Sequence, residues 1–505
     1  MVLEGKHGTH PQARTNDVSL EEWFRPFAEQ IIGKDQEFLS PYGKKKIIYA
    51  DWTASGRLYQ SIEDKMLHEI GPYVANTHTE TSITGACMTQ AYHEAREIIK
   101  QHVHAGADDV LISVGSGMTG AVNKFQRILG FKVSESLSAF SDVPKLLKPI
   151  VFVSHMEHHS NQISWMETIA DVEVVPCNEE GLICMDQFEQ MIRKYEDRKI
   201  KIASITAASN VTGIKTNYHA VAKLIHSYDG LCFVDFACSA PYVKIDMHPK
   251  DPQASLDAIF FSPHKFLGGP GSSGILVFNK KLYSNHIPDN PGGGTVTFTN
   301  PWGGRYYISD IEVREDGGTP AFLQTIRVAL AMKLKDQMGV KNIHEREAEI
   351  NKIMFERLSR MKGVQIFAGK HKNRLSIFSF QVTNIHYNLV AKLLNDRYGI
   401  QSRGGCSCAG TYGHYLFEID QENSRSLREE IEAGVLTKKP GWIRISLHPT
   451  FSNKEVEYIC DALEDIIRHH KEWAKDYTYN LLSNDFDFKG EHETMDEVVS
   501  SWFAI

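Results

Sequence analysis

The chain has 505 residues, of which 42% are hydrophobic and 23% are charged, and its formal net charge is −8. This composition is typical of a soluble globular protein that is long enough for two domains and a substantial core. The acidic balance, without any block of lysines and arginines, excludes nucleic acid and an anionic membrane surface as expected partners. Residues 1–20 are polar and no apolar run is long enough to span a bilayer, so we expect a cytoplasmic protein.

The N-terminal region begins with a polar segment, residues 1–45. It contains one short amphipathic piece, Leu20 to Ile32, and we expect an arm or helix that packs on a small domain nearer the C-terminus. The stretch from Ile47 to Gly56 then reads as a short strand running into a turn. A helix is expected over Thr89 to His104, and a strand over Asp108 to Val114.

Residues 115–120 match the pattern G-x-G-x-x-G between this strand and a helix expected to begin near Ala121. The pattern is compatible with a dinucleotide site, which makes a nicotinamide-dependent oxidoreductase one alternative. About 20 residues further on, where such a site usually has its acidic residue, this chain has the loop from Ser134 to Asp142, so the match is weak. What the pattern still predicts is a helix N-terminus with exposed amides, which binds phosphate of any origin.

Beyond Pro149, apolar strands alternate with helices. The expected strands are Ile150 to Ser154, Val172 to Pro176, Lys201 to Thr206, Leu231 to Asp235, Ala258 to Ser262 and Gly274 to Phe278, and the expected helices include Asp186 to Tyr195 and His219 to Ser227. This alternation predicts an α/β domain with a mostly parallel sheet covered by helices on both faces. Ligands of such sheets collect at the carboxyl ends of the strands, where this chain has polar residues.

Lys265 lies at one of these strand ends, followed by a glycine cluster. A lysine enclosed by strands and glycines is paired, extends its amine to solvent, or is kept for that amine, which becomes nucleophilic when its pKa is lowered. Asp235 ends the strand about thirty residues earlier, consistent with two neighbouring strands that present both groups at one edge. An amine, a carboxylate, imidazoles and a phosphate cup are the groups that pyridoxal phosphate requires.

The C-terminal part follows two glycine-rich stretches, 291–304 and 314–320. Two long helices are expected, Phe322 to Met338 and Ile343 to Met361, leading into a smaller α+β domain with strands near Leu375 to Val382 and Trp442 to Leu447. We therefore expect four segments, which are an arm at 1–45, a large domain at 46–335, a small domain at 336–480 and a tail at 481–505. No function is assigned to the tail.

Nine motifs occur in the order typical of one enzyme family. They are Tyr49 to Ser55, Gly117-Met118-Thr119, Glu157 to Asn161, Ser209 to Gly213, Val234-Asp235, Ser262 to Lys265, Gly318-Thr319-Pro320, Arg403 to Cys408 and Arg444-Ile445-Ser446. Over about residues 47–465 the chain resembles the class V aminotransferase branch of fold-type I pyridoxal-phosphate enzymes, and most of all the cysteine desulfurase and selenocysteine lyase group. The resemblance implies a large domain with a seven-stranded type of sheet and a smaller C-terminal domain.

The resemblance also implies roles at matching positions. Lys265 would be the Schiff-base lysine and later proton shuttle, Asp235 would hold the pyridine nitrogen, and His158 would stack on the ring and assist proton transfer. Thr119, Ser262 and His264 match the positions that bind the cofactor's phosphate, and Gly117 and Met118 are also implied to bind the cofactor. Thr319 matches a threonine that reaches the phosphate in the neighbouring subunit, so the resemblance implies a homodimer with shared active sites. Asn210 and Arg444 match the positions that hold the substrate's α-carboxylate.

Three cysteines bear on which reaction of the family this chain catalyses. Cys408 aligns with the loop cysteine that attacks the substrate sulfur and carries it as a persulfide, and Arg403 nearby favours a reactive thiol. Cys406 adds a thiol that the family usually lacks, leaving open a redox-active pair or a metal site with His414. Two cysteines and one histidine are too few ligands, so we expect no metal. Cys238 stands where the family generally has a glutamine that bonds the cofactor's phenolic oxygen, and a thiol is a weaker donor.

The sequence therefore predicts a pyridoxal-phosphate enzyme that acts on a small amino acid. Cleavage of a cysteine-like carbon–sulfur bond, giving alanine and enzyme-bound sulfur that passes to an acceptor protein, is favoured. Transamination, epimerisation and kynureninase-like carbon–carbon cleavage use the same architecture and stay open, because a fold does not fix a reaction. A catalytically inactive scaffold or sulfur-relay partner that retains the fold is a further alternative.

Overall fold

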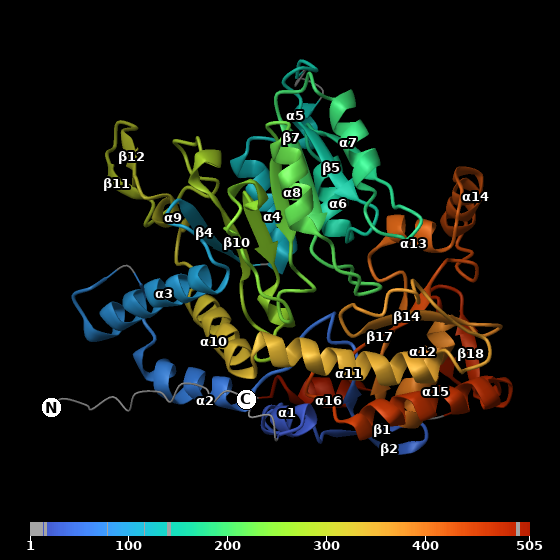
Figure 1. Ribbon diagram of the computed structural model, residues 1–505. Coiled ribbons are helices and arrows are strands. Elements are labelled where there is room, and N and C mark those ends of the chain that lie inside the picture. The colour runs from blue at the N-terminus through green and yellow to red at the C-terminus, as the bar shows by residue number, and fades with distance from the viewer. Residues whose placement is uncertain are drawn as a thin grey trace.

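The computed structural model describes residues 14, 18–77, 79–115, 117–138, 143–490 and 495–504. Its centre is a seven-stranded sheet, here called the large sheet (Figure 1). In spatial order the strands are β4 (Asp109–Val114), β10 (Gly274–Asn279), β9 (Ala258–Phe261), β8 (Leu231–Asp235), β7 (Lys201–Thr206), β5 (Ile150–Ser154) and β6 (Asp171–Val175). Strand β10 runs opposite to the other six strands of this sheet, which are parallel to one another. The prediction of a mostly parallel α/β sheet is confirmed.

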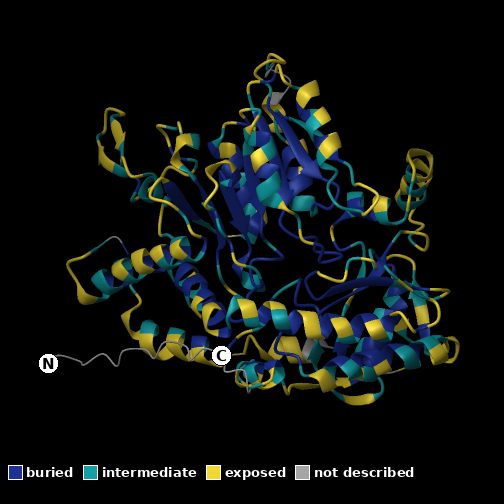
Figure 2. Cartoon of the chain, viewed as in Figure 1, coloured by how far each residue is buried: buried dark blue, intermediate teal, exposed yellow. Residues whose placement is uncertain are grey.

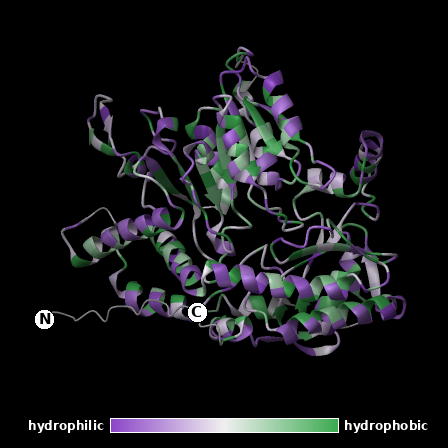
Figure 3. Ribbon diagram, viewed as in Figure 1, coloured by the Kyte–Doolittle hydropathy of each residue, from purple (hydrophilic) through white to green (hydrophobic). Residues whose placement is uncertain are grey.

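Helices cover both faces of the large sheet because its strands are apolar on both sides. On β5, Ile150 and Phe152 face one core, whereas Val151 and Val153 face the other. The first face is packed by α3 (Ile83–His102), α7 (Met185–Lys194), α8 (Tyr218–His226) and α10 (Phe322–Met338), and the second by α4 (Gly117–Ile128) and α6 (His159–Met166). The strands are buried and hydrophobic, while the helices turn their polar residues outward (Figures 2 and 3).

Two helices begin earlier than the apolar pattern predicts. Helix α4 begins at Gly117 instead of near Ala121, because the hydroxyl of Ser262, on a distant strand end, accepts a hydrogen bond from the Met118 amide. Helix α3 begins at Ile83 instead of Thr89, with Ser82 capping its first turn by accepting from the Gly85 amide.

A second, four-stranded antiparallel sheet, here called the small sheet, lies nearer the C-terminus. Its order is β13 (Val364–Ile366), β14 (Ile377–Val382), β17 (Trp442–Ser446) and β16 (Arg403–Gly405). Three helices associated with it lie together in Figure 1, namely α11 (Val340–Leu358), α12 (Tyr387–Tyr398) and α15 (Asn453–Trp473). The connection from α10 is the single residue Gly339, at φ +79°, and our proposed boundary at residue 335 falls in the last turn of α10.

Two N-terminal elements, α1 (Leu20–Glu29) and β3 (Ile48–Tyr49), contact this region and the end of α10. Helix α1 begins with a capping box at Ser19, and its Trp23 indole donates to the Met338 carbonyl at 2.9 Å. Strand β3 pairs in parallel with β15 (Ile400–Gln401). The remaining elements are β1 (Glu37–Ser40), β2 (Gly43–Lys46), α2 (Gln60–Asp64), α5 (Glu135–Ser138), β11 (Val296–Thr299), β12 (Arg305–Tyr307), α9 (Ile311–Glu315), α13 (Gly410–Leu416), α14 (Gln421–Glu432), β18 (Tyr477–Asn480), β19 (Asp485–Phe488) and α16 (Met495–Ser501). Among the described helices, none combines the length and apolarity that crossing a bilayer requires.

Candidate active site

One cavity of about 470 Å³ lies where the carboxyl ends of the large-sheet strands face the small sheet. Twelve of the residues predicted from the sequence line it, namely Gly117, Met118, Thr119, His158, Asn210, Asp235, Cys238, Ser262, His264, Lys265, Cys408 and Arg444. Thr319 does not line it and is exposed. Its predicted role is in the site of a neighbouring subunit, and this role stays a prediction.

Asp235 ends β8, and Lys265 ends the short 3-10 turn Pro263–Lys265 that follows the adjacent parallel strand β9, so both side chains lie at one edge of the sheet. Burial lowers the pKa of the Lys265 amine, and the neighbouring Cys238 and Asp235 partly offset that fall. Burial also raises the pKa of Asp235 to about 6, against the opposing effects of the Ala237 amide, which donates to Oδ1 at 2.7 Å, and of Lys265. The site thus holds an amine that deprotonates readily beside a buried carboxyl group.

The start of α4 faces this pair and is open enough for an anionic group. Gly117 has φ +58°, and a Cβ added there would come within 3.0 Å of the Ser262 hydroxyl. Thr119 and Ser160 hydroxyls are 2.7 Å apart, and His264 Nδ1 is 3.3 Å from the Ser55 hydroxyl. Hydroxyls, an imidazole and helix N-terminal amides are therefore gathered at one end of the cavity, as a phosphate cup requires.

His158 lines the cavity and is the N-cap residue of α6. Its Nδ1 accepts from the Ser160 amide at 3.1 Å, which fixes the ring at the helix N-cap. Burial lowers the pKa of His158 to about 3, and the charge of Lys265 adds to this effect. The imidazole is therefore neutral near pH 7, as a ring that lies against an aromatic cofactor would need to be.

The segment carrying Cys408 forms a tight turn over the cavity. Ser407 and Cys408 both have positive φ, 52° and 55°, and the Ala409 amide donates to the Cys406 carbonyl at 3.1 Å. Consecutive non-glycine residues in this conformation are strained, so contacts must hold the turn. Asn210 Nδ2 donates to the Ser407 carbonyl at 2.8 Å. Cys408 is exposed on the cavity lining, whereas Cys406 is half-buried and does not line it.

Cys238 and His414 both have hydrogen-bond partners within the protein. The Cys238 thiol donates to the Ala208 carbonyl at 2.9 Å, and burial raises its pKa to about 12. It is therefore a neutral donor already engaged with the main chain. His414 uses both ring nitrogens, Nδ1 toward the Gly410 carbonyl at 2.8 Å and Nε2 toward the Ser424 hydroxyl at 2.9 Å, so neither is directed at Cys406 or Cys408.

Arg403 and Asp51 belong to the site although the sequence analysis gave neither a binding role. Arg403 lines the cavity next to Arg444. Asp51 lies behind them and forms ion pairs with both, to Arg444 Nη2 at 2.5 Å and to Arg403 Nε at 3.0 Å. Nothing in the local sequence near Asp51 could have indicated this contact, because Arg444 is 393 residues away.

The cavity lining includes buried polar atoms that have no hydrogen-bond partner within the described part of the chain. They are Thr53 Oγ1, Asn210 Oδ1, Ser272 Oγ, Ser407 Oγ and Arg444 Nε. Buried polar groups without partners are costly, and their gathering around one cavity is typical of a binding site. Together with Lys265, Asp235 and the opening at Gly117, this donor set fits pyridoxal phosphate carrying an amino acid.

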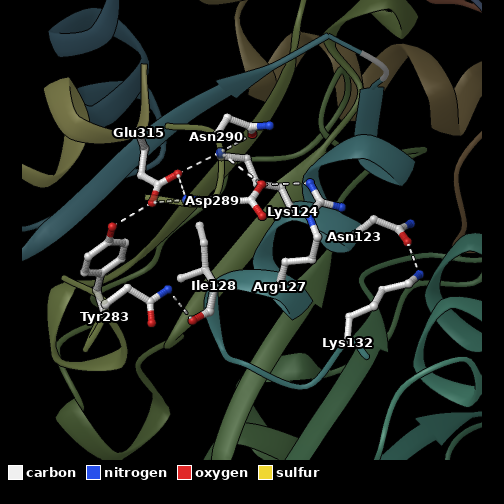
Figure 4. Close-up of polar contacts among 10 residues, drawn as sticks. Asn123, Lys124, Arg127, Ile128, Lys132, Tyr283, Asp289, Asn290 and Glu315 are labelled. Atoms are coloured by element: carbon white, nitrogen blue, oxygen red, sulfur yellow. Dashed lines mark hydrogen bonds and ion pairs between the residues drawn. The ribbon is translucent and has the colours of Figure 1, made fainter. Parts of the chain in front are cut away.

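A buried ionic network anchors the other end of α4 (Figure 4). Lys124 Nζ contacts Glu315 Oε2 at 2.7 Å, Asp289 Oδ2 at 3.3 Å and Asn290 Oδ1 at 3.1 Å. Arg127 adds two bonds to the same Asp289 carboxylate, at 2.7 and 2.9 Å. The network ties the helix whose N-terminus forms the anion cup to the segment that leads to Thr319.

A buried lysine and aspartate at neighbouring strand ends, opposite a glycine-opened helix N-terminus, define an α/β enzyme site of the fold-type I class. The chain belongs to the class V aminotransferase family, whose model, described as "Aminotransferase class-V", matches residues 48–459. This match confirms the predicted family. Members of the family are pyridoxal-phosphate-dependent enzymes.

Several known proteins similar to this chain are named cysteine desulfurases. A "Probable cysteine desulfurase" of Staphylococcus aureus is 26% identical over 369 residues, covering 72% of this chain and 84% of that protein, and one of Staphylococcus epidermidis matches equally. The solved apo structure of a cysteine desulfurase from Thermococcus onnurineus superposes with a TM-score of 0.70 at 20% identity, over 88% of this chain and 98% of that one. A cysteine desulfurase from Escherichia coli, in an S-sulfonic acid form, gives 0.68 at 20% identity and the same coverage. The structural likeness confirms the fold.

Proposed function

We propose that this protein binds pyridoxal phosphate and breaks the carbon–sulfur bond of cysteine or a closely similar amino acid, leaving alanine and sulfur bound to Cys408. The observation that carries the proposal is the exposed Cys408 on the same cavity lining as the buried Lys265 and Asp235. Transamination requires the lysine and the aspartate but does not require a thiol at the position of Cys408. The names of the similar proteins support the same choice.

The cofactor supplies, when bound, an electron-accepting ring that stabilises negative charge at substrate carbons. Asp235 would keep the pyridine nitrogen protonated, and Lys265 would be the amine that holds the cofactor and later moves a proton at the substrate's α-carbon. The hydroxyls of Thr119 and Ser262 and the His264 ring would bind the phosphate. Arg444 would pair with the α-carboxylate and so orient the substrate in the cavity.

Sulfur transfer to Cys408 balances without an added oxidant. The Cys408 sulfur bonds to the substrate sulfur as the substrate's carbon–sulfur bond breaks, and the β-carbon gains a proton. The products are alanine and the persulfide Cys408–S–SH, so sulfur is oxidised to the sulfane level while carbon is reduced to a methyl group. A thiol on a strained turn at the cavity mouth is placed to take sulfur from the cavity and present it outside.

The experiment compares the wild type with Cys408→Ala, Cys406→Ala and Lys265→Ala, each loaded with pyridoxal phosphate and given cysteine. We expect Cys408→Ala to retain the visible absorption band of lysine-bound cofactor while alanine formation falls at least about a hundredfold. Cys406→Ala is the matched control and should retain most of its activity. Lys265→Ala should lose the band. Full alanine formation by Cys408→Ala would overturn the persulfide proposal, and a wild type without the band would overturn the cofactor assignment.

We also propose that the enzyme is a cytoplasmic homodimer that passes sulfur to an acceptor protein. The exposed position of Thr319, away from the cavity of its own chain, supports a role in the neighbouring subunit's site. The exposure of Cys408 supports transfer to a second protein. The division of the chain at residues 45, 335 and 480 is likewise a proposal.

A further inference from the structure

Arg403 and Arg444 stand directly opposite each other on the antiparallel strands β16 and β17. Side chains of such a pair project from the same face of the sheet, and both of these line the cavity. Two like charges in this arrangement repel each other and destabilise the sheet. A counter-charge is therefore required wherever the two arginines are held close together.

Asp51 supplies that counter-charge. Its Oδ1 accepts from Arg444 Nη2 at 2.5 Å and its Oδ2 from Arg403 Nε at 3.0 Å, so each carboxylate oxygen serves one arginine. The Arg444 side chain is 3% exposed and that of Asp51 is 11% exposed, whereas Arg403 is 45% exposed. The Asp51–Arg444 contact is consequently shielded from water, where a charge interaction is strong.

The main chain fixes Asp51 to the strand that carries Arg444. The Ser446 amide donates to the Ala50 carbonyl at 2.8 Å, and the Thr53 amide donates to the Ser446 hydroxyl at 2.9 Å. Asp51 also forms a parallel bridge with Ser446. The three charged residues thus belong to one rigid unit, and Asp51 cannot withdraw from the arginines without breaking that edge of the sheet.

We propose that Asp51 is a positioning residue that sets the charge selectivity of the substrate site. Two arginines and one aspartate leave a single positive charge, which matches one α-carboxylate. An amino acid with a second carboxylate would meet no second unpaired cation at this pair of arginines, and Lys265 and Asp235, which also line the cavity, carry opposite charges. The inference rests on one part of the proposed function, namely that the cavity binds the carboxylate of an amino acid, and not on the reaction that follows.

Two hydrogen bonds also fix the orientation of the Arg444 guanidinium. With Nη2 on Asp51 and Nη1 donating to the Asn210 carbonyl at 3.2 Å, the guanidinium plane is set from two sides. Its Nε, which lacks a partner among the described residues, remains for the ligand. Replacing the aspartate should therefore change both the charge and the orientation of the carboxylate site.

The test measures equilibrium binding of two unreactive anions, propionate with one carboxylate and succinate with two, by calorimetry on the cofactor-loaded protein. In Asp51→Asn we expect the ratio of the propionate Kd to the succinate Kd to rise about tenfold, because the second carboxylate gains an unpaired cation. Asp51→Glu keeps the charge and should hold the ratio within about twofold of the wild type. Arg403→Gln removes one cation and should lower the ratio.

A ratio in Asp51→Asn within twofold of the wild type would overturn the proposal, and so would a rise in Arg403→Gln. Arg403→Gln keeps the test decisive if Asp51→Asn does not fold. Because the Arg403 side chain is half exposed, its replacement should leave the fold intact. A purely structural role for Asp51 would change both dissociation constants together and leave the ratio unmoved. If the wild type forms no alanine from cysteine but the ratio shifts as expected, the proposed function fails and this inference stands.

Discussion

The main-chain amide of His159 donates a hydrogen bond to the carbonyl of Cys408 at 2.8 Å, and the His159 ring accepts another from the Gly410 amide at 2.9 Å. His158, the preceding residue, lines the cavity. The first turn of α6 therefore presents one imidazole to the cofactor cavity and uses the next to hold the cysteine turn. This arrangement ties the strained turn to the large sheet.

We expect His159→Ala to loosen this turn. Losing the acceptor for the Gly410 amide costs about 1 kcal/mol, which is roughly a fivefold change in the population of open turns. Hydrogen exchange of the Ala409 amide, which donates to the Cys406 carbonyl within the turn, should speed up by about that factor, while the visible band of the cofactor is unchanged. His159→Gln retains an acceptor and is the matched control. Equal exchange rates of this amide in the wild type and His159→Ala would refute the prediction.

We expect Lys124→Met to destabilise the protein by about 3–5 kcal/mol, because it leaves the buried Glu315 carboxylate without its cation. Urea-induced unfolding followed by circular dichroism measures the loss. The double variant Lys124→Met/Glu315→Gln should recover part of it, since the uncompensated charge is then absent. If the two single losses simply add in the double variant, Lys124 and Glu315 are not coupled.

The stability of the protein should also depend on pH through Glu347. Burial raises the pKa of this carboxyl group from 4.5 to about 8, and its described partner is the Ser376 amide, which donates to Oε1 at 3.0 Å. Between these two pKa values the unfolded chain has lost a proton that the folded chain retains. The free energy of unfolding therefore falls as pH rises, by up to about 1.4 kcal/mol per pH unit from this group.

Glu347→Gln removes this titration without changing the side-chain shape. Relative to the wild type, the variant should gain stability steadily between pH 5 and pH 8, measured as the difference between their urea unfolding free energies at each pH. Ser376→Ala, which keeps the main-chain amide, serves as a control that leaves the slope in place. A difference that is the same at every pH would show that Glu347 is ionised in the folded protein.

Much of the fold could be predicted because the large-sheet strands are continuous apolar runs. The expected strand over Lys201 to Thr206 matches β7, and Lys265 and Asp235 could be assigned to one sheet edge because parallel strands end together. Helices α12 and α15 were not predicted, although both bury apolar residues at helical spacing. The start of α4 could not be predicted from local sequence, because its cap is the hydroxyl of Ser262.

The candidate site was predictable where a residue type has one evident chemical use, and not where its role depends on tertiary contacts. A lysine at a strand end indicates chemistry by itself, and a cysteine in a glycine-rich loop does so less strongly. Asp51, in contrast, follows a short strand like many turn aspartates. Its function as the partner of two arginines becomes visible only when β3 pairs with β15 and brings Asp51 to the end of β17.

That pairing has a consequence for biosynthesis. Residues 48–53, of which Thr53 lines the cavity, join strands that include residues 400–401 and 442–446. A growing polypeptide on the ribosome therefore lacks this edge of the pocket until residues 442–446 have been synthesised. A truncated product ending before β17 would retain Arg403 but would leave Asp51 without Arg444, its buried partner.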